Sequence, residues 1–211
     1  MIIASTSTVF GSGYLDYLLP VLQVHFKNVN TVTFIPYAMP GGISYDAYTG
    51  IVAQAFSKIN MNVKGIHEYE SSKEAILNAE AIFTGGGNTF ELVNQLYKHD
   101  LLNNLKLTLE RGVPYLGTSA GSNICGVDIK NTNDMPIVYP PSFKTLGCFS
   151  FNINAHYLDP EKGSKHMGES RETRIKEFHV FNETPVLGLR EGSWLSIENN
   201  KIILQGEHTA R

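Results

Sequence analysis

Short apolar runs alternate with longer segments of helical periodicity through the first half of the chain. Runs such as 31–35 and 81–84 are apolar or β-branched at nearly every position, which is typical of strands covered on both faces. Between them, as in 45–59, apolar residues recur on one side of a helix. Strand followed by helix, repeated with Gly- or Pro-marked joints, predicts an α/β fold: a doubly wound, mostly parallel sheet with helices on both faces.

The predicted elements cover most of the chain. After Gly121 the pattern breaks, and residues 126–150 are rich in loop-forming residues. No linker or repeat interrupts the sequence, so residues 1–211 are expected to form a single domain. Strands are expected at 1–4, 31–35, 62–66, 81–84, 113–117, 151–155 and 185–189, with a hairpin over 193–204 that turns at Asn199-Asn200. Helices are expected at 14–26 (where Pro20 could introduce a kink), 45–59, 72–79, 89–98, 101–111 and 164–181.

Composition narrows the class of protein. Hydrophobic residues make up 42% and charged residues 18% of the 211, which is a globular balance. The net charge of −3 and the scattered basic residues give no footprint for nucleic acid or an anionic membrane. The N-terminus lacks the charged and apolar regions of a signal peptide, and no run approaches the ~20 apolar residues of a membrane span. The two cysteines do not form a disulfide framework, so a cytoplasmic protein is expected.

The sharpest local motif lies at residues 117–121, which read G-T-S-A-G. This G-x-S-x-G follows a predicted strand directly and precedes a plausible helix, the context of a nucleophile elbow. The small residues allow a sharp turn that would present the Ser119 hydroxyl above the sheet edge. The backbone N–H of Ala120 could then face a developing oxyanion.

A second glycine cluster, Gly85-Gly86-Gly87-Asn88, also lies between a predicted strand and a helix. It could be a phosphate cradle, although neither G-x-G-x-x-G nor G-K-[ST] spacing is present. It could also be a simple turn, or the source of a second oxyanion donor opposite Ala120. Carboxyl ends of parallel strands share one sheet edge, which favours the third interpretation.

A serine nucleophile needs a base and an acid that orients it. His156 follows the predicted strand 151–155 and is therefore placed at a strand terminus. Two acids could orient it: Asp134, in a polar loop after the elbow, and Glu191, just past the strand 185–189. Each could equally be a turn former or a solvated charge, and the spacing does not choose between them.

Several segments in one order resemble the peptidase E family of serine peptidases, the aspartyl dipeptidases and their cyanophycinase-like relatives. The resemblance covers nearly the whole chain, and the combination of GGGNTF, SAGSN and TNDMPI is more specific than any single motif. The matching segments are 34–36, 85–90, 114–123, 132–137, 154–156, 168–175 and 188–195.

This resemblance implies a fold similar to class I glutamine amidotransferase domains, and a substrate that is a small acidic peptide with an N-terminal aspartate. No metal or organic cofactor is implied, and the protein would be a monomer or homodimer without nucleic-acid or membrane partners. The family pattern implies that Ser119 is the nucleophile, His156 the general base, Glu191 the triad acid and Asp134 a further essential acid, with oxyanion donors at Gly87 and Ala120. It also implies that Arg171 holds the aspartate side chain, and Asn88, within the matching GGGNTF segment, is a further candidate for substrate contact. Arg190 departs from the family pattern, in which an uncharged residue precedes the acid, and could add a second contact for an acidic substrate.

Other functions remain open on sequence grounds. An enzyme of the same fold could act on another acyl substrate, as a broader dipeptidase, a β-aspartyl peptidase or an esterase. A non-catalytic module could keep the pocket for an amino acid or peptide, and a small-nucleotide binder could use residues 85–88.

Overall fold

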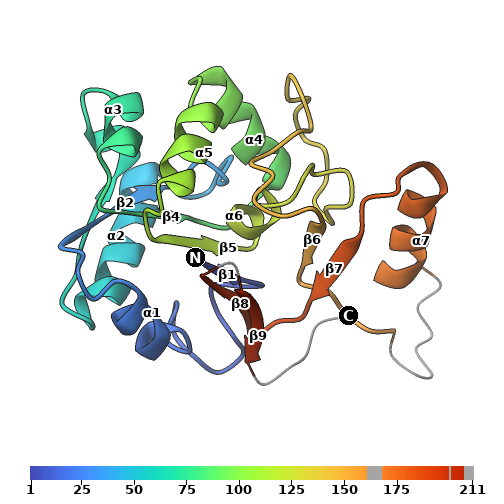
Figure 1. Cartoon of the computed structure of the whole chain (residues 1–211), viewed down its shortest axis with the longest axis horizontal. Coiled ribbons are helices and arrows are strands. Elements are labelled where there is room, and N and C mark those ends of the chain that lie inside the picture. Colours follow the sequence, from blue (N-terminus) through green and yellow to red (C-terminus); the bar gives the residue numbers. More distant parts are fainter. Residues whose placement is uncertain (161–167, 200, 207–211) are drawn as a thin grey trace.

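The computed structural model describes residues 1–160, 168–199 and 201–206, which are built around a seven-stranded sheet (Figure 1). The strand order is β3-β2-β4-β5-β1-β8-β9. The first five strands in this order are parallel, and β8 and β9 extend the sheet antiparallel to their neighbours. The strands are β1 (Ile2–Ala4), β2 (Thr31–Ile35), β3 (Asn62–Gly65), β4 (Ala81–Thr84), β5 (Tyr115–Thr118), β8 (Ser193–Glu198) and β9 (Lys201–Gly206).

Helices cover both faces of this sheet, so the predicted fold class is confirmed. Each face has its own apolar core, because neighbouring residues of one strand point to opposite sides. In β4, Ile82 joins one core, whereas Ala81 and Phe83 join the other. Helices α1 (Leu19–His25) and α2 (Tyr45–Ser57) pack on the Phe83 face, and α3 (Ser72–Leu77), α4 (Thr89–Lys98), α5 (Leu102–Glu110) and α6 (Ala120–Asn123) pack on the Ile82 face.

A second, two-stranded parallel sheet stands beside the large one. It pairs β6 (Asn152–Ala155) with β7 (Val186–Leu189), and α7 (Arg171–Phe181) lies next to it (Figure 1). The long segment between α6 and β6 contains no helix or strand, as the sequence predicts. The Asn152 side chain holds this segment, accepting the backbone N–H groups of Val127 and Asp128.

Most predicted elements are confirmed within one or two residues, and 31–35, 81–84 and 89–98 match the observed bounds. The helix expected at 14–26 is wrong in its first part, because α1 begins only at Leu19 and Pro20 lies in its first turn instead of kinking it. The helix expected at 164–181 starts at Arg171, capped by the Ser170 hydroxyl, and residues 164–167 lie outside the described residues.

The predicted hairpin near the C-terminus is confirmed as β8 and β9, which pair antiparallel. Asn199 adopts a positive φ of 49° at the expected turn, and Asn200 lies outside the described residues. Across the described residues, none of the helices combines the length and the apolar character that crossing a membrane requires.

Candidate active site

Ser119 occupies a sharp turn between β5 and α6. Its backbone has φ 52° and ψ −112°, an uncommon conformation for a residue with a side chain, and its N–H donates to the Ala4 carbonyl at 3.1 Å. A Cβ added at Gly121 would overlap the Thr84 carbonyl, and one at Gly117 would lie 2.5 Å from the Gly121 carbonyl oxygen. The flanking glycines therefore let the turn pack directly against β4, as a nucleophile elbow requires.

The residues after Ser119 anchor this turn to three other segments. The Ser122 hydroxyl lies 2.6 Å from the Ala4 carbonyl oxygen and 2.9 Å from that of Gly117. The Asn123 amide donates to the Thr89 hydroxyl at 3.0 Å and accepts the Ala155 N–H at 3.2 Å. Both side chains are buried, so the turn is fixed by satisfied hydrogen bonds and not only by its own backbone.

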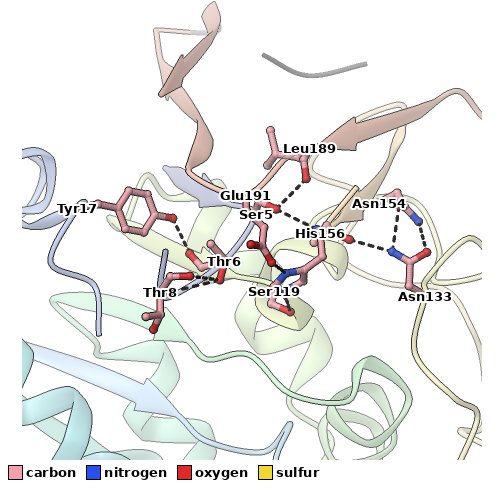
Figure 2. A network of polar contacts seen from close by, with 11 residues as sticks. Ser5, Thr6, Thr8, Tyr17, Ser119, Asn133, Asn154, His156, Leu189 and Glu191 are labelled. Carbon is pink, nitrogen blue, oxygen red and sulfur yellow. Dashed lines mark hydrogen bonds and ion pairs between the residues drawn. The ribbon is translucent and has the colours of Figure 1, made fainter. Parts of the chain in front are cut away.

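His156 lies between Ser119 and Glu191, in the hydrogen-bonded chain that Figure 2 shows. Its Nε2 is 2.9 Å from Ser119 Oγ, and its Nδ1 is 2.8 Å from Glu191 Oε1. A carboxylate only accepts, so the Glu191 contact favours the tautomer with the proton on Nδ1. Nε2 is then free to accept the serine proton, which is the arrangement of a nucleophile, a base and an orienting acid.

Ser5 holds the backbone of His156 in place, although no motif in the sequence marks it as a functional residue. Its buried hydroxyl accepts the His156 N–H at 2.9 Å and donates to the Leu189 carbonyl at 2.7 Å (Figure 2). His156 itself has a positive φ of 55°, so this contact helps to hold an uncommon conformation. The one clue to this role is the position of Ser5 directly after β1, because the carboxyl end of β1 adjoins that of β5.

Asp134 and Glu191 have different partners, although the sequence left both open as the acid that orients His156. The Asp134 Oδ2 atom accepts the Thr89 N–H at 2.7 Å and lies 3.2 Å from the Thr132 hydroxyl. Glu191 is the acid that accepts a hydrogen bond from His156 Nδ1. Asp134 nevertheless lines the same pocket as Ser119 and His156, so its charge faces the region where a substrate would lie.

The two glycine-rich strand ends lie side by side, as expected, because β4 and β5 are neighbours in the sheet. A Cβ on Gly86 would be 3.0 Å from that of Ser119. Gly87 has φ 137° and lies so close to the Ala38 carbonyl that only glycine fits there. Gly87 lines the pocket of Ser119, and Ala120 begins α6, so its N–H has no acceptor within that helix.

A second pocket of about 440 Å³ is also lined by His156 and contains both predicted substrate-binding arginines. Arg190 donates to Asp159 through Nε at 2.7 Å and Nη2 at 3.0 Å, so its guanidinium is engaged in a bidentate ion pair. Arg171 is the first residue of α7. Burial lowers the pKa of Arg171 from its ordinary value, whereas the negative charge of Asp134 raises it. The two opposite charges are therefore close enough to interact.

Both the oxygen and the nitrogen of the Asn88 side-chain amide make hydrogen bonds to nearby backbone groups. Its oxygen caps α4 by accepting the Glu91 N–H at 3.1 Å, and its nitrogen donates to the Met135 carbonyl at 2.8 Å. Asn88 is not among the residues that line the pocket of Ser119. These contacts hold the loop that carries Asp134 against the start of α4, which differs from the predicted substrate contact.

Comparison with known proteins gives one consistent result. Residues 1–205 match the family model described as Peptidase family S51. A Drosophila melanogaster protein named "Probable alpha-aspartyl dipeptidase" is 45% identical over all of this chain and 88% of its own length. "Peptidase E" of Streptomyces coelicolor is 44% identical over all of this chain and 86% of its own length.

Solved structures agree on the fold. A peptidase from an acI-B1 Actinobacterium superposes with a TM-score of 0.69 at 14% identity, covering 99% of this chain and 88% of that one. A Listeria monocytogenes EGD-e protein superposes with a TM-score of 0.74 at 18% identity, covering 98% of both chains.

Proposed function

The chain belongs to peptidase family S51, and from this premise we propose that it is a serine dipeptidase that hydrolyses dipeptides with an N-terminal aspartate. The observation that carries the proposal is the chain of hydrogen bonds from Glu191 through His156 to Ser119. A non-catalytic module would need neither the strained serine turn nor a carboxylate on the far side of the imidazole.

The proposed reaction is acyl transfer to Ser119. His156 Nε2 takes the hydroxyl proton while Oγ attacks the peptide carbonyl, and the Gly87 and Ala120 N–H groups hold the resulting oxyanion. Glu191 stabilises the imidazolium that forms. His156 then protonates the leaving amine, the C–N bond breaks, and water activated by the same imidazole releases the N-terminal residue from the serine ester.

Two opposite charges support selection of an N-terminal aspartate. That residue carries a side-chain carboxylate and a free ammonium group. Arg171 offers a guanidinium that can bind the carboxylate bidentately, and Asp134 offers a carboxylate to the ammonium. The curated relatives named for aspartyl dipeptides and peptidase E point to the same substrate class.

The test compares hydrolysis of Asp-Leu by the wild type and by Ser119→Ala, with Ser57→Ala as the matched control. Ser57 is an exposed serine at the end of α2, so its variant should keep full activity. The Ser119 variant should lose activity by on the order of 10⁴-fold or more. Equal activity in the two would overturn the proposal.

Two further measurements separate the alternatives. Rates on Leu-Leu and on isoaspartyl-Leu distinguish an aspartyl dipeptidase, which should prefer Asp-Leu, from a broader dipeptidase or a β-aspartyl peptidase. A fluorophosphonate probe should label the wild type at Ser119. Folded protein that resists the probe and leaves Asp-Leu intact would favour a binding module.

We also propose that residues 1–211 act as one peptidase domain in the cytoplasm. The nucleophile follows a strand of the large sheet and the base follows a strand of the small one, so neither sheet holds the site alone. The free thiols of Cys125 and Cys148 fit a reducing compartment.

A further inference from the structure

The pocket of Ser119 has an apolar wall that the proposed chemistry leaves unused. The pocket encloses about 490 Å³. Besides the polar and catalytic-site residues, it is lined by Tyr14, Met39, Ile43, Tyr48 and Ile51, which we call the apolar wall. These residues come from the loop after β1, the loop after β2 and the first half of α2. The wall is therefore assembled from three separate segments, which is how a shaped binding surface is built in this class of fold.

The wall is fixed to the nucleophile turn by hydrogen bonds. The Tyr48 hydroxyl donates to the Gly86 carbonyl at 3.3 Å and lies 3.2 Å from the Tyr14 hydroxyl. Gly86 in turn packs against Ser119, with 3.0 Å between the serine Cβ and a Cβ built on the glycine. One residue thus separates the aromatic pair from the nucleophile, so a side chain next to the scissile bond can reach the wall.

The loop after β1, which contributes residues to the lining of this pocket, is also held in place. The Tyr17 hydroxyl donates to the Thr6 carbonyl at 2.6 Å, and the Thr6 hydroxyl donates to the Thr8 carbonyl at 2.9 Å (Figure 2). Thr6 lines the pocket, and the loop leads on to Tyr14. The apolar wall is therefore largely formed before a ligand binds, as in most small-molecule sites.

Charge separates this pocket from the one that holds Arg171. His156 is the residue that lines both pockets. The arginine pocket suits the acidic acyl residue, whereas the described residues that line the Ser119 pocket include no lysine or arginine and one carboxylate, Asp134. A second acidic residue of a substrate would meet an apolar surface there, without a cation to bind its carboxylate.

We propose that this wall is the subsite for the leaving residue and that it selects an apolar side chain, so the preferred substrates are Asp-Xaa dipeptides with a leucine-like or aromatic Xaa. The inference rests on the proposed function, because it assigns the acyl residue to the Arg171 side of His156. With the carbonyl carbon at Ser119 Oγ, the amide nitrogen must lie near His156 Nε2 to receive its proton. The next side chain then extends toward Met39 and Ile43, where burial of apolar area contributes to binding in the transition state.

The test measures kcat/KM of the wild type on Asp-Leu, Asp-Gly and Asp-Glu. Asp-Leu should exceed Asp-Gly by about 10-fold or more, in line with the discrimination that a few buried methylenes give. Asp-Glu should be the poorest. If the wild type cleaves the three equally, the subsite is wrong while the proposed function stands. If it cleaves none of them, the proposed function itself fails, and this inference with it.

Variants of the wall make the test specific. Ile43→Ala and Met39→Ala should lower kcat/KM for Asp-Leu by about 3- to 10-fold and leave Asp-Gly within about 2-fold. Val24→Ala, a matched truncation of a 70% exposed apolar residue on α1, should change neither rate. Ile51 is 40% exposed, so Ile51→Lys should fold and raise the Asp-Glu rate relative to Asp-Leu. Parallel losses on Asp-Leu and Asp-Gly in the wall variants would overturn the assignment.

Discussion

The substitution Ser5→Ala tests how the proposed base, His156, is held in position. The substitution removes one buried hydroxyl that accepts the His156 N–H and donates to the Leu189 carbonyl. Ser5 is 0% exposed, so water does not readily replace either bond. A buried polar group left without a partner costs about 1–3 kcal/mol. With two such groups, the free energy of unfolding should fall by about 2–6 kcal/mol.

The effect on catalysis follows from the position of the imidazole. Without Ser5, the backbone of His156 can relax from its positive φ, and the ring moves relative to Ser119. A misplacement of about 1 Å can cost about 10²-fold in rate. We therefore expect kcat for Asp-Leu to fall by about 10- to 100-fold with little change in KM, because Ser5 does not touch the substrate.

Ser193→Ala is the matched control, since Ser193 is also 0% exposed but its hydroxyl has no hydrogen-bond partner among the described residues. Its variant should be at least as stable as the wild type in urea titration and keep its kcat. An unchanged kcat in folded Ser5→Ala would refute the positioning role. An equal loss of stability in both variants would show that packing volume, not hydrogen bonding, is responsible.

Three other changes test separate parts of the structure. Gly121→Ala places a Cβ against the Thr84 carbonyl and should cost several kcal/mol of stability by urea titration. Gly50→Ala, on the exposed side of α2 with no described atom within 4 Å of the new Cβ, should stabilise the protein by about 0.5–1 kcal/mol, and equal effects of the two would contradict the packing of the elbow. Burial lowers the pKa of His25 to about 4, so an unfolded state with the ordinary value of 6.5 binds the proton first. The contribution of His25 to the free energy of unfolding is therefore fully present above pH 6.5 and is lost as the pH falls toward 4. Between pH 7 and pH 5 the free energy of unfolding should fall by about 2 kcal/mol more in the wild type than in His25→Gln. Matching losses would refute the lowered pKa of His25. Asp134→Asn should lower kcat/KM for Asp-Leu by about 10-fold or more while sparing succinyl-Leu, which lacks the ammonium; equal losses on the two substrates would argue against that contact.

The sequence predicted the large sheet well because its strands are unambiguous. Residues 81–84 are apolar throughout and are covered by helices on both faces, so their composition alone indicates a central strand. The turn at Ser119 is equally predictable from the sequence. The backbone approaches its neighbours so closely at positions 117 and 121 that both must be glycine, which produces the recognisable G-x-S-x-G spacing. The first helix was less clear, because the apolar residues before Leu19 are buried in a turn and still repeat at helical spacing.

The contacts of the base could not be predicted in the same way. Ser5 and His156 are 151 positions apart, and nothing in either neighbourhood records that pairing. The choice between Asp134 and Glu191 depended on which strand lies beside β6, a question of sheet register. Local sequence constrains the conformation of each segment, whereas register depends on contacts made after the segments meet.

The geometry of the site follows from two parallel strand pairs that end at one place. In the large sheet, Thr84 pairs with Gly117, so the chain that continues from each brings Gly86 against Ser119 and Gly87 into the same pocket. In the small sheet, Ala155 pairs with Leu189, so the following residues bring His156 beside Glu191. Each strand pair therefore arranges one half of the proposed site: the proposed oxyanion donors with the nucleophile, and the proposed base with its acid.

The alignment of these two halves depends on the few contacts that cross between the sheets. Ser5 joins the end of β1 to both β6 and β7, and Asn123 joins α6 to the last residue of β6. A change within one half, such as Ser119→Ala, should remove a defined chemical role. A change in a crossing contact should leave every role present but misaligned, which lowers kcat while substrate binding persists. The loss of kcat in Ser5→Ala should accordingly exceed any change in KM, and Asn123→Ala should behave in the same way.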